Sequence, residues 1–396
     1  MRFLTGVDWV RLGVLTVAAL FLAHLAWHDA RLLLRRQPLG IDFLPMWAGA
    51  REALLHSGRI YDFAALTHVV RPLLGRFHGW RPFVYPPTAL LAFAPFAFAP
   101  FSLANAAWTA VGLVALVWTM AEQLGGRGRL VLAVMVLSPA SVLVAITGQV
   151  TFLIAAATVI ALASLKRRPW LAGTLLGLAA SMKPQTLVLL PVALIGVGQW
   201  RALVAAAASA AAAVAASLAI YGAELWPAWL AALPRFEQFV MHAPGLERGM
   251  VTPTSLGLWM GLHRDALVLW RLGFGGAAAA MAWLVFRRTD DLARRLTALL
   301  GGGLFVTPYA MHYDAALLAP AAVLLLARPS RPGAWLMALG AGALLCCAVI
   351  PHWGAAAVTA FVLLVACGGE SPAPDLAWDA ATKPIFMLMR RRPASA

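Results

Sequence analysis

Long apolar stretches with very few charges run through the whole chain and limit what it can fold into. Of its 396 residues, 62% are hydrophobic and only 12% are charged, and the mean hydropathy is +0.80. Many stretches approach the roughly 20 residues that a helix needs to cross about 30 Å of hydrocarbon. The strand-length alternation typical of membrane β-barrels is absent. The sequence therefore predicts an all-α, polytopic transmembrane protein in which residues 1–396 form a single transmembrane domain.

The distribution of basic residues predicts how the spans are oriented. Basic clusters such as residues 166–168 and 287–295 fall on every second connection, as the positive-inside rule expects. This phase places the N-terminus and a basic tail, residues 370–396, in the cytoplasm. Two long loops, residues 28–103 and 222–265, then lie on the outer side of an inner or plasma membrane. About twelve spans are expected, centred near residues 19, 113, 139, 158, 175, 192, 212, 276, 300, 320, 341 and 360.

The charge and the cysteines exclude several classes of protein. The net charge is +15, but the basic residues are scattered between spans, which does not indicate a nucleic-acid surface. The first outer loop holds more arginines than acids, so it is an exception to the charge rule; an anionic ligand or anionic lipid headgroups would both explain this. The three cysteines imply no disulfide framework and no zinc site. They are Cys346, Cys347 and Cys367.

Two interfacial helices are expected in the first outer loop. Residues 43–57 carry Arg51 and Glu52 on one side, and Gly58 is expected to close this helix. Its apolar face would consist of Phe43, Met46, Trp47, Ala50 and Leu54. Residues 87–101 are apolar but short and interrupted by prolines, which favours a re-entrant or surface helix. A true span there would invert every later loop, and the charge bias argues against this.

Polar residues gather at the predicted outer ends of separate spans. Because these ends share one depth, their side chains are expected to line a cavity that opens outward. They are Gln149, Lys183, His312 and Asp314. Each also has a simpler explanation: Gln149 as a helix cap or link, Lys183 as a snorkelling side chain, His312 as part of an aromatic belt. Asp42, at the head of the first interfacial helix, is either an N-cap or a functional acid.

Several short motifs carry a resemblance to a known family. In the first loop they are Asp42-Phe43, Trp47-Ala48, Ala53-Leu54, Gly58, Ile60-Tyr61-Asp62 and Phe83-Val84-Tyr85-Pro86-Pro87. Later come Thr147-Gly148-Gln149, Ser181-Met182-Lys183-Pro184 and His312-Tyr313-Asp314. Together they resemble the membrane glycosyltransferases of the GT-C superfamily, and more narrowly family 87, the polyprenyl-phosphate-mannose-dependent α-mannosyltransferases. The match runs from residue 40 to about 315.

The resemblance implies an inverting glycosyltransferase of the cell envelope. It would move a sugar, mannose in that family, from a polyprenyl-phosphate donor to a lipid or glycan acceptor at the outer face. Asp42 would be the catalytic base, and Lys183 and His312 would bind the donor phosphate. Further substrate contacts are expected from Gln149, Tyr85 and Asp314. No second acid stands beside Asp42, so the paired-acid metal motif of oligosaccharyltransferases is missing, and no metal, nucleotide or other cofactor is expected.

Two other classes of membrane protein remain as alternatives. A transporter or lipid flippase usually has ionisable residues near the bilayer midplane and repeated halves. Here only Arg271 and His24 fall in the middle of predicted spans, and no repeat is visible. A structural subunit would leave the outward polar cluster without a role.

Overall fold

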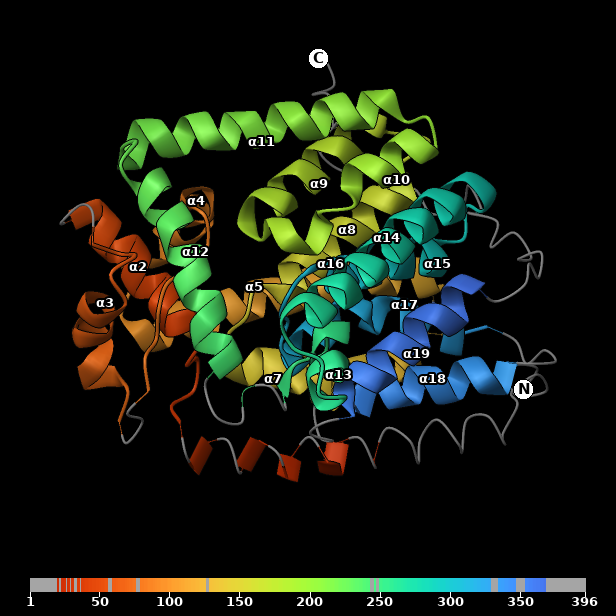
Figure 1. The fold of residues 1–396 in the computed structure, drawn as a ribbon, viewed down its shortest axis with the longest axis horizontal. Coiled ribbons are helices and arrows are strands. Elements are labelled where there is room, and N and C mark those ends of the chain that lie inside the picture. Colours follow the sequence, from red (N-terminus) through yellow and green to blue (C-terminus); the bar gives the residue numbers. More distant parts are fainter. Residues whose placement is uncertain are drawn as a thin grey trace, which may run out of the picture.

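The computed structural model describes residues 37–55, 59–75, 79–125, 128–242, 246, 249–328, 334–346 and 353–367, and scattered residues between 20 and 35. Within these residues the protein is all-helical, as the sequence predicted (Figure 1). The one pairing of strand type in the described part is an isolated antiparallel bridge between Met250 and Met311. Most of the predicted first span near residue 19 and all of the basic tail lie outside the described residues.

The α-helices follow one another along almost the whole described chain. They are α2 (Phe43–Leu55), α3 (Phe63–Val70), α4 (Leu90–Phe93), α5 (Phe101–Leu124), α6 (Arg129–Leu137), α7 (Pro139–Thr147), α8 (Thr151–Ser164), α9 (Pro169–Met182), α10 (Leu190–Gly196), α11 (Trp200–Tyr221), α12 (Leu225–His242), α13 (Pro253–Trp259), α14 (Arg264–Arg288), α15 (Leu292–Leu296), α16 (Gly302–Val306), α17 (Ala319–Leu326), α18 (Ala334–Cys346) and α19 (Gly354–Cys367). Shorter turns are η1 (Arg71–Leu73), η2 (Pro87–Ala89), η3 (Ala94–Phe96), η5 (Pro184–Leu187), the π-helical η7 (Thr297–Gly301) and η8 (His312–Leu318).

Three described helices, α5, α11 and α14, are long and apolar enough to cross a membrane. Helices α6 and α7 would form a fourth span, bent by 56°. The bend falls at Ser138, whose ψ of 145° is extended, because a residue before proline avoids the helical region. The expected span centres from residue 113 onward all fall in helical segments. Most of these segments are shorter than a full span, so the total of twelve stays a prediction.

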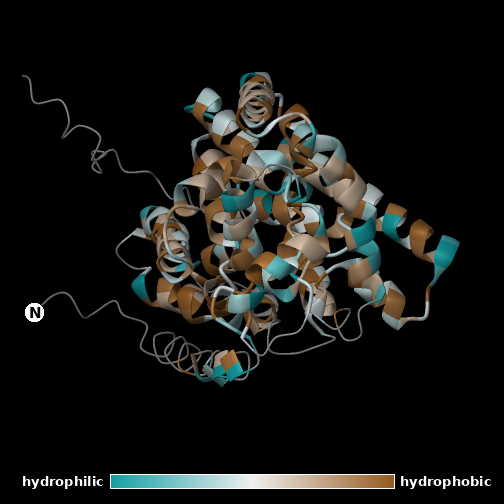
Figure 2. Ribbon diagram, turned by 90° about the vertical axis from the view of Figure 1, so that its left-hand side faces the viewer, coloured by the Kyte–Doolittle hydropathy of each residue, from teal (hydrophilic) through white to brown (hydrophobic). Residues whose placement is uncertain are grey.

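The three long helices expose large apolar side chains, which suits contact with lipid. Leu103 and Val114 are exposed on α5, and Leu269 and Leu272 on α14. Figure 2 shows that hydrophobic residues occupy much of the helical ribbon. Such surfaces would be costly in water, so this pattern agrees with an integral membrane protein.

Small residues allow α9 and α11 to pack closely. A Cβ atom at Gly173 of α9 would lie 2.1 Å from the backbone oxygen of Ala202, and one at Gly177 would lie 2.3 Å from that of Ala206. Two glycines four residues apart on one helix face let two backbones approach without intervening side chains. This contact holds the C-terminal end of α9, where Lys183 follows, in a defined place.

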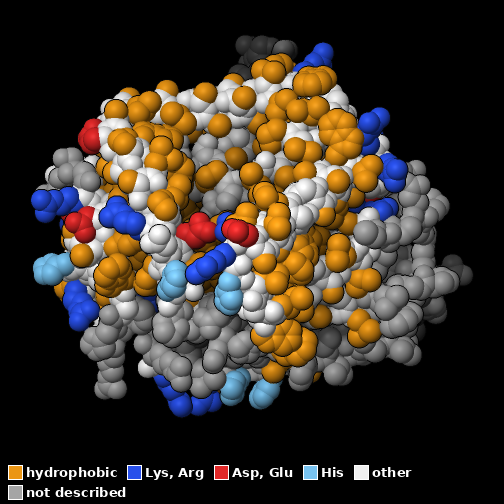
Figure 3. Space-filling view, viewed as in Figure 1, with side chains coloured by type: hydrophobic (Ala, Val, Ile, Leu, Met, Phe, Trp, Pro, Cys, Tyr) orange, Lys and Arg blue, Asp and Glu red, His pale blue; other side chains and the backbone are white. Residues whose placement is uncertain are grey.

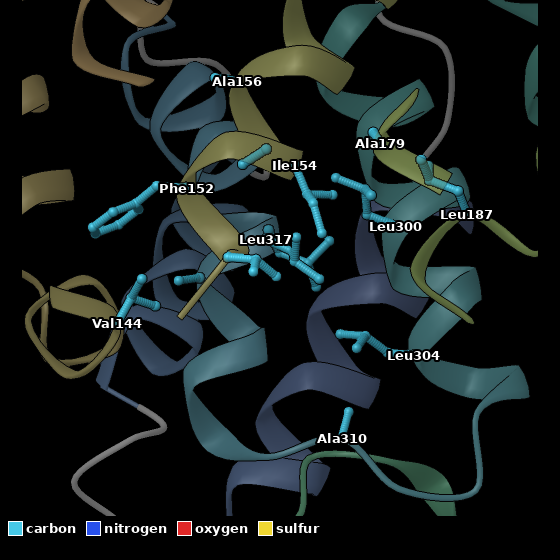
Figure 4. Close-up of a cluster of buried hydrophobic side chains, with 14 of the residues drawn as sticks. Val144, Phe152, Ile154, Ala156, Ala179, Leu187, Leu300, Leu304, Ala310 and Leu317 are labelled. Carbon is cyan, nitrogen blue, oxygen red and sulfur yellow. The ribbon is translucent and has the colours of Figure 1, made fainter. Parts of the chain in front are cut away.

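A buried apolar cluster joins the segments that carry the polar residues. Its side chains come from α7, α8, α9, η5, η7, α16 and η8 and interdigitate in the middle of the bundle (Figure 4). Labelled members include Val144, Phe152, Ile154, Leu187, Leu300, Leu304 and Leu317. Residues 149, 183 and 312 adjoin the ends of elements that contribute to this cluster, so the packing of the cluster sets their relative positions.

The two helices expected in the first outer loop are present, with one error in the predicted face. Helix α2 packs against α3, α4 and α5 and buries Phe43, Met46 and Ala50, while Arg51 is exposed. Leu54 was placed on the buried face but is 36% exposed, because Ala53 takes the inward position in that turn. Residues 87–96 form η2, α4 and η3, which are too short to cross a bilayer. Whether either helix lies on the membrane surface stays a prediction; Gly58 is outside the described residues.

Candidate active site

Asp42 is fixed by backbone bonds between the segment just before α2 and the end of α7. The amide of Gly40 donates to the carbonyl of Ile146 at 2.7 Å, and the amide of Asp42 donates to that of Thr147 at 3.0 Å. These two bonds bring together segments about 105 residues apart in sequence. As a result Gln149, two residues beyond Thr147, lies beside the Asp42 side chain.

Gly148 makes this junction possible. Its φ is +77°, in the left-handed region that favours glycine, and it ends α7. A Cβ atom there would lie 2.6 Å from the Cβ atom of Phe43, closer than real Cβ contacts. The indole of Trp108 donates to the Gly148 carbonyl at 3.1 Å, and its ring stacks on Phe43 with 5.5 Å between centroids. The start of α2 and the end of α7 are therefore held together by Trp108, which contacts both.

The carboxylate of Asp42 is held by two side chains. Arg81 Nη1 donates to Oδ1 at 3.3 Å, and Gln149 Nε2 donates to Oδ2 at 2.9 Å. The Asp42 side chain is 18% exposed, so solvent or a ligand can still reach it. The amide of Leu44, the partner expected of an N-cap, donates instead to the Gly40 carbonyl. Among the described residues no helix amide donates to this carboxylate, so the structure does not support the N-cap alternative.

Tyr85 extends the network away from Asp42. Its hydroxyl donates to Gln149 Oε1 at 3.0 Å, and the buried Tyr61 hydroxyl donates to the Tyr85 carbonyl at 2.7 Å. Burial raises the pKa of Tyr85 well above its ordinary value, with further contributions from the negative charges of Asp314 and Asp42. The Tyr85 phenol therefore stays protonated and acts as a donor throughout the physiological range.

Arg81 carries the positive charge nearest to Asp42. Burial lowers the pKa of Arg81 from its ordinary value, and the Asp42 charge opposes that shift. An arginine keeps its charge even so, because a guanidinium is not deprotonated in proteins. In the sequence Arg81 is one of several arginines in its loop, and its residue type alone assigns it no role. The only signal was its position two residues before the Phe83-to-Pro87 motif.

Lys183 and Asp314 form a second, more deeply buried pair. Lys183 Nζ donates to Asp314 Oδ1 at 2.5 Å, and the two side chains are only 10% and 4% exposed. Asp314 Oδ2 also accepts from the amide of Met311 at 3.2 Å. Lys183 follows the last residue of α9 and precedes Pro184, so the chain turns there and the ammonium points inward. The structure thus does not support the snorkelling alternative for Lys183.

Tyr313 joins the two parts of the site. The Lys183 Nζ lies 5.7 Å from the centre of the Tyr313 ring, a distance suited to a cation–π contact. Tyr313 also interacts electrostatically with Asp42, Asp314 and Arg81. The carboxylate at Asp42 and the pair at Lys183 therefore belong to one polar site.

His312 lies at the edge of this site. Its Nδ1 is 3.1 Å from the carbonyl oxygen of Gly249, and its ring centroid is 6.0 Å from that of Tyr313. This contact and the bridge between Met250 and Met311 join the second outer loop to η8. The His312 imidazole therefore lies next to Tyr313 of the polar site and also contacts Gly249 of the second long loop.

Helix α12 covers the loop that contains Arg81 and Tyr85. The indole of Trp229 donates to the Val84 carbonyl at 3.1 Å, and Phe236 packs edge-on against Phe63 with 6.3 Å between centroids. Glu237 of α12 pairs with Arg271 of α14 at 3.0 Å. In Figure 3, charged side chains and histidines gather in the middle of this face, between the regions of α12 and α13. Helix α12 therefore forms part of the wall around the site.

The described residues contain no group of three or more histidine, cysteine, aspartate or glutamate side chains that could hold a metal ion. The charged groups of the site are two carboxylates, one ammonium and one guanidinium. Such a set can accept a proton at Asp42 and neutralise an incoming anion at Lys183 and Arg81.

Comparison with known proteins identifies the family. The family model described as glycosyltransferase family 87 matches residues 83–308, which is more than half of the chain. The chain belongs to glycosyltransferase family 87. This confirms the resemblance, and the transporter and scaffold alternatives are not favoured. The matched region includes Tyr85, Gln149 and Lys183, while Asp42 and Asp314 lie outside it.

Two mycobacterial relatives carry the same name, polyprenol-phosphate-mannose-dependent alpha-(1-2)-phosphatidylinositol mannoside mannosyltransferase. The protein from Mycobacterium tuberculosis is 27% identical over 344 residues, covering 81% of this chain and 76% of the relative. The one from Mycolicibacterium smegmatis is 34% identical over 184 residues, covering 41% of this chain and 40% of the relative. No solved structure matches.

Proposed function

We propose that the protein transfers a mannosyl group from polyprenyl-phosphate mannose to a hydroxyl group of a lipid or glycan acceptor. The donor class is supported by the names of the two relatives. The observation that carries the proposal is the Asp42 carboxylate, which is held by Arg81 and Gln149 yet still reachable, beside a buried cation at Lys183. A glycosyl transfer needs both a base for the acceptor and a cation for the leaving phosphate.

In the proposed reaction Asp42 is the general base. The acceptor hydroxyl gives its proton to the Asp42 carboxylate while its oxygen forms a bond to C1 of the sugar. The bond between C1 and the phosphate oxygen breaks, and polyprenyl phosphate leaves with the electron pair. Attack on the face opposite the phosphate inverts the configuration at C1.

Lys183 and His312 are proposed to bind the donor phosphate. In the structure Lys183 is paired with Asp314, so the phosphate would compete with that carboxylate for the ammonium group. Arg81 adds a third donor beside Asp42. A phosphate whose negative charge grows in the transition state is stabilised most by such fixed, partly buried donors.

The proposed site faces the outer side of the membrane. The alternation of basic clusters along the chain supports this side, and about twelve helical segments would then cross the bilayer. Helix α2 and the segment from η2 to η3 would lie near the outer surface. A lipid donor could then bring its phosphate to the site without leaving the membrane.

The test is sugar transfer by the purified protein and by Asp42→Asn. Protein in lipid nanodiscs is incubated with radiolabelled polyprenyl-phosphate mannose and a membrane extract, and the labelled product is identified. Asparagine keeps the shape of the side chain but removes the proton acceptor, so transfer is expected to fall by about 100-fold or more, while donor binding and thermal stability stay close to those of the parent.

Asp62→Asn is the matched control. Asp62 is another acid of the first loop, and its carboxylate accepts from the amides of Ala64 and Ala65 as the N-cap of α3. Asparagine caps about as well as aspartate, so this variant should transfer sugar normally. A folded Asp42→Asn protein with near-normal transfer would show that Asp42 is not the base.

A further inference from the structure

The side chain of Gln149 bonds both to Asp42 and to Tyr85. The chain runs from the Tyr85 hydroxyl to Gln149 Oε1 at 3.0 Å, and from Gln149 Nε2 to Asp42 Oδ2 at 2.9 Å. Gln149 is itself buried. Both polar ends of its amide are therefore occupied inside the protein, and neither is directed at open solvent.

From this geometry we propose that Gln149 and Tyr85 are positioning residues, which hold the Asp42 carboxylate in the orientation that accepts the proton of the acceptor hydroxyl. The sequence predicts substrate contacts for both residues. The inference rests on the proposed role of Asp42 as the base. It assigns to Gln149 and Tyr85 an action through Asp42 and not on the sugar.

The chemistry of the Asp42 carboxylate, the Gln149 amide and the Tyr85 phenol permits only one orientation of the amide. An ionised carboxylate only accepts hydrogen bonds, so the Gln149 atom that faces Asp42 must be the NH₂ group. The carbonyl oxygen then faces Tyr85, which must donate. Burial raises the pKa of Tyr85, so this phenol does not lose its proton at the pH where the enzyme works. Tyr85 thus keeps the Gln149 amide from turning its oxygen toward Asp42.

Asp42 needs such support because a general base must stay within hydrogen-bond reach of the proton it takes. Its side chain has two rotatable bonds and stands at the start of α2. The Gln149 bond fixes Oδ2, whereas among the described residues Oδ1 has only the longer contact of 3.3 Å from Arg81. Oδ1 is therefore the oxygen left to face the acceptor.

Gln149→Glu gives the sharpest test, because it replaces the donor with a second carboxyl group beside Asp42. Two carboxyl groups at hydrogen-bond distance do not both ionise at neutral pH and share a proton instead. Turnover of this variant is expected to be low at pH 6 and to rise with pH, with a midpoint at least about one unit above that of the parent. The other charged and titratable groups that face Asp42 are unchanged: Arg81, Tyr85 and Tyr313, with Lys183 and Asp314 beyond them.

Two further variants separate positioning from substrate binding. Gln149→Met keeps the volume and removes both bonds, and is expected to lower kcat at least about tenfold with donor KM within twofold. Tyr85→Phe removes one oxygen and should lower kcat about three- to tenfold, again without a change in KM. Tyr61→Phe is the matched control, since it also removes a buried phenol hydroxyl, but one whose bond is to the Tyr85 backbone and not to the Gln149 side chain. Its kcat should stay within twofold of the parent.

The outcomes distinguish this inference from the proposed function. A flat pH profile for Gln149→Glu, or a raised donor KM with normal kcat in Gln149→Met and Tyr85→Phe, would overturn the positioning role while Asp42→Asn remained inactive. If Asp42→Asn were active in the same assay, the base itself would be wrong and both proposals would fall. If Gln149→Met does not fold, Tyr85→Phe still tests the positioning role, because it removes a single oxygen atom.

Discussion

The buried pair of Lys183 and Asp314 can be tested for a structural and a functional role at the same time. Its atoms are 2.5 Å apart and its side chains are almost fully buried. Removal of one partner from such a pair leaves an uncompensated charge and costs about 3–5 kcal/mol of unfolding free energy. Lys183→Met and Asp314→Asn should each show this loss. The double variant leaves no buried charge at the pair, so it should be less destabilised than the sum of the two, with a coupling of about 2–3 kcal/mol.

These variants are expected to change activity in a different way from stability. If Lys183 binds the donor phosphate, the double variant regains stability but not activity, because the cation is still missing. Loss of a charged partner to a buried phosphate costs about 2–5 kcal/mol of binding free energy, which is at least about thirtyfold in donor affinity. Thermal unfolding of the detergent-purified protein, followed by tryptophan fluorescence, measures the first effect, and binding of radiolabelled donor measures the second.

Lys166 is the matched control for this experiment. It pairs with Asp290, but these side chains are 63% and 58% exposed. An exposed pair contributes about 1 kcal/mol or less, so Lys166→Met should leave stability and donor binding nearly unchanged. Stability losses at Lys183 and Asp314 that simply add in the double variant would refute the coupling. Normal donor affinity in a folded Lys183→Met protein would refute the phosphate role.

Two further predictions concern backbone geometry and pH. Gly148→Ala should cost about 3 kcal/mol of unfolding free energy and abolish transfer, since the new methyl group would collide with Phe43. Gly198→Ala is its control: Gly198 also has a positive φ and follows the end of α10, but nothing lies within 4 Å of the added Cβ atom, so this change should cost only about 1 kcal/mol in thermal unfolding. Burial raises the pKa of Tyr61 and Tyr85. The unfolded chain therefore loses these protons first, so stability should be intact below about pH 10 and fall as the pH rises above it. Thermal unfolding between pH 8 and 11 should show a shallower fall in Tyr61→Phe than in the parent; an equal fall would contradict this reasoning.

The sequence by itself predicted the helical architecture, and it singled out several of the polar residues that the structure brings together. Backbone polar groups inside a bilayer must bond within their own segment, so long apolar stretches can only be helices, and those expected around residues 113, 212 and 276 are the three longest apolar helices of the structure. Gln149 and Lys183 stood out because predicted span ends share one depth, and Asp42 stood out because it lies at the head of the first helix of its loop. Burial on α2 was also predicted in part: Phe43 and Met46 are buried, but Leu54 is not, because helical spacing alone does not say how far the partner helices extend.

Only the tertiary structure decided which polar groups meet. Gln149 reaches Asp42 across 107 positions, and Lys183 reaches Asp314 across 131. No local pattern encodes such pairs, because they depend on where α7, α9 and η8 end once their apolar faces have packed together. The same holds for Arg81, one of many arginines in its loop. Arg81 pairs with Asp42 because α12 packs on that loop and the aromatic rings around Phe43 hold the start of α2 in place. Side-chain chemistry and span ends are local properties of a sequence, whereas a hydrogen-bonded site of this kind is a product of packing between distant segments.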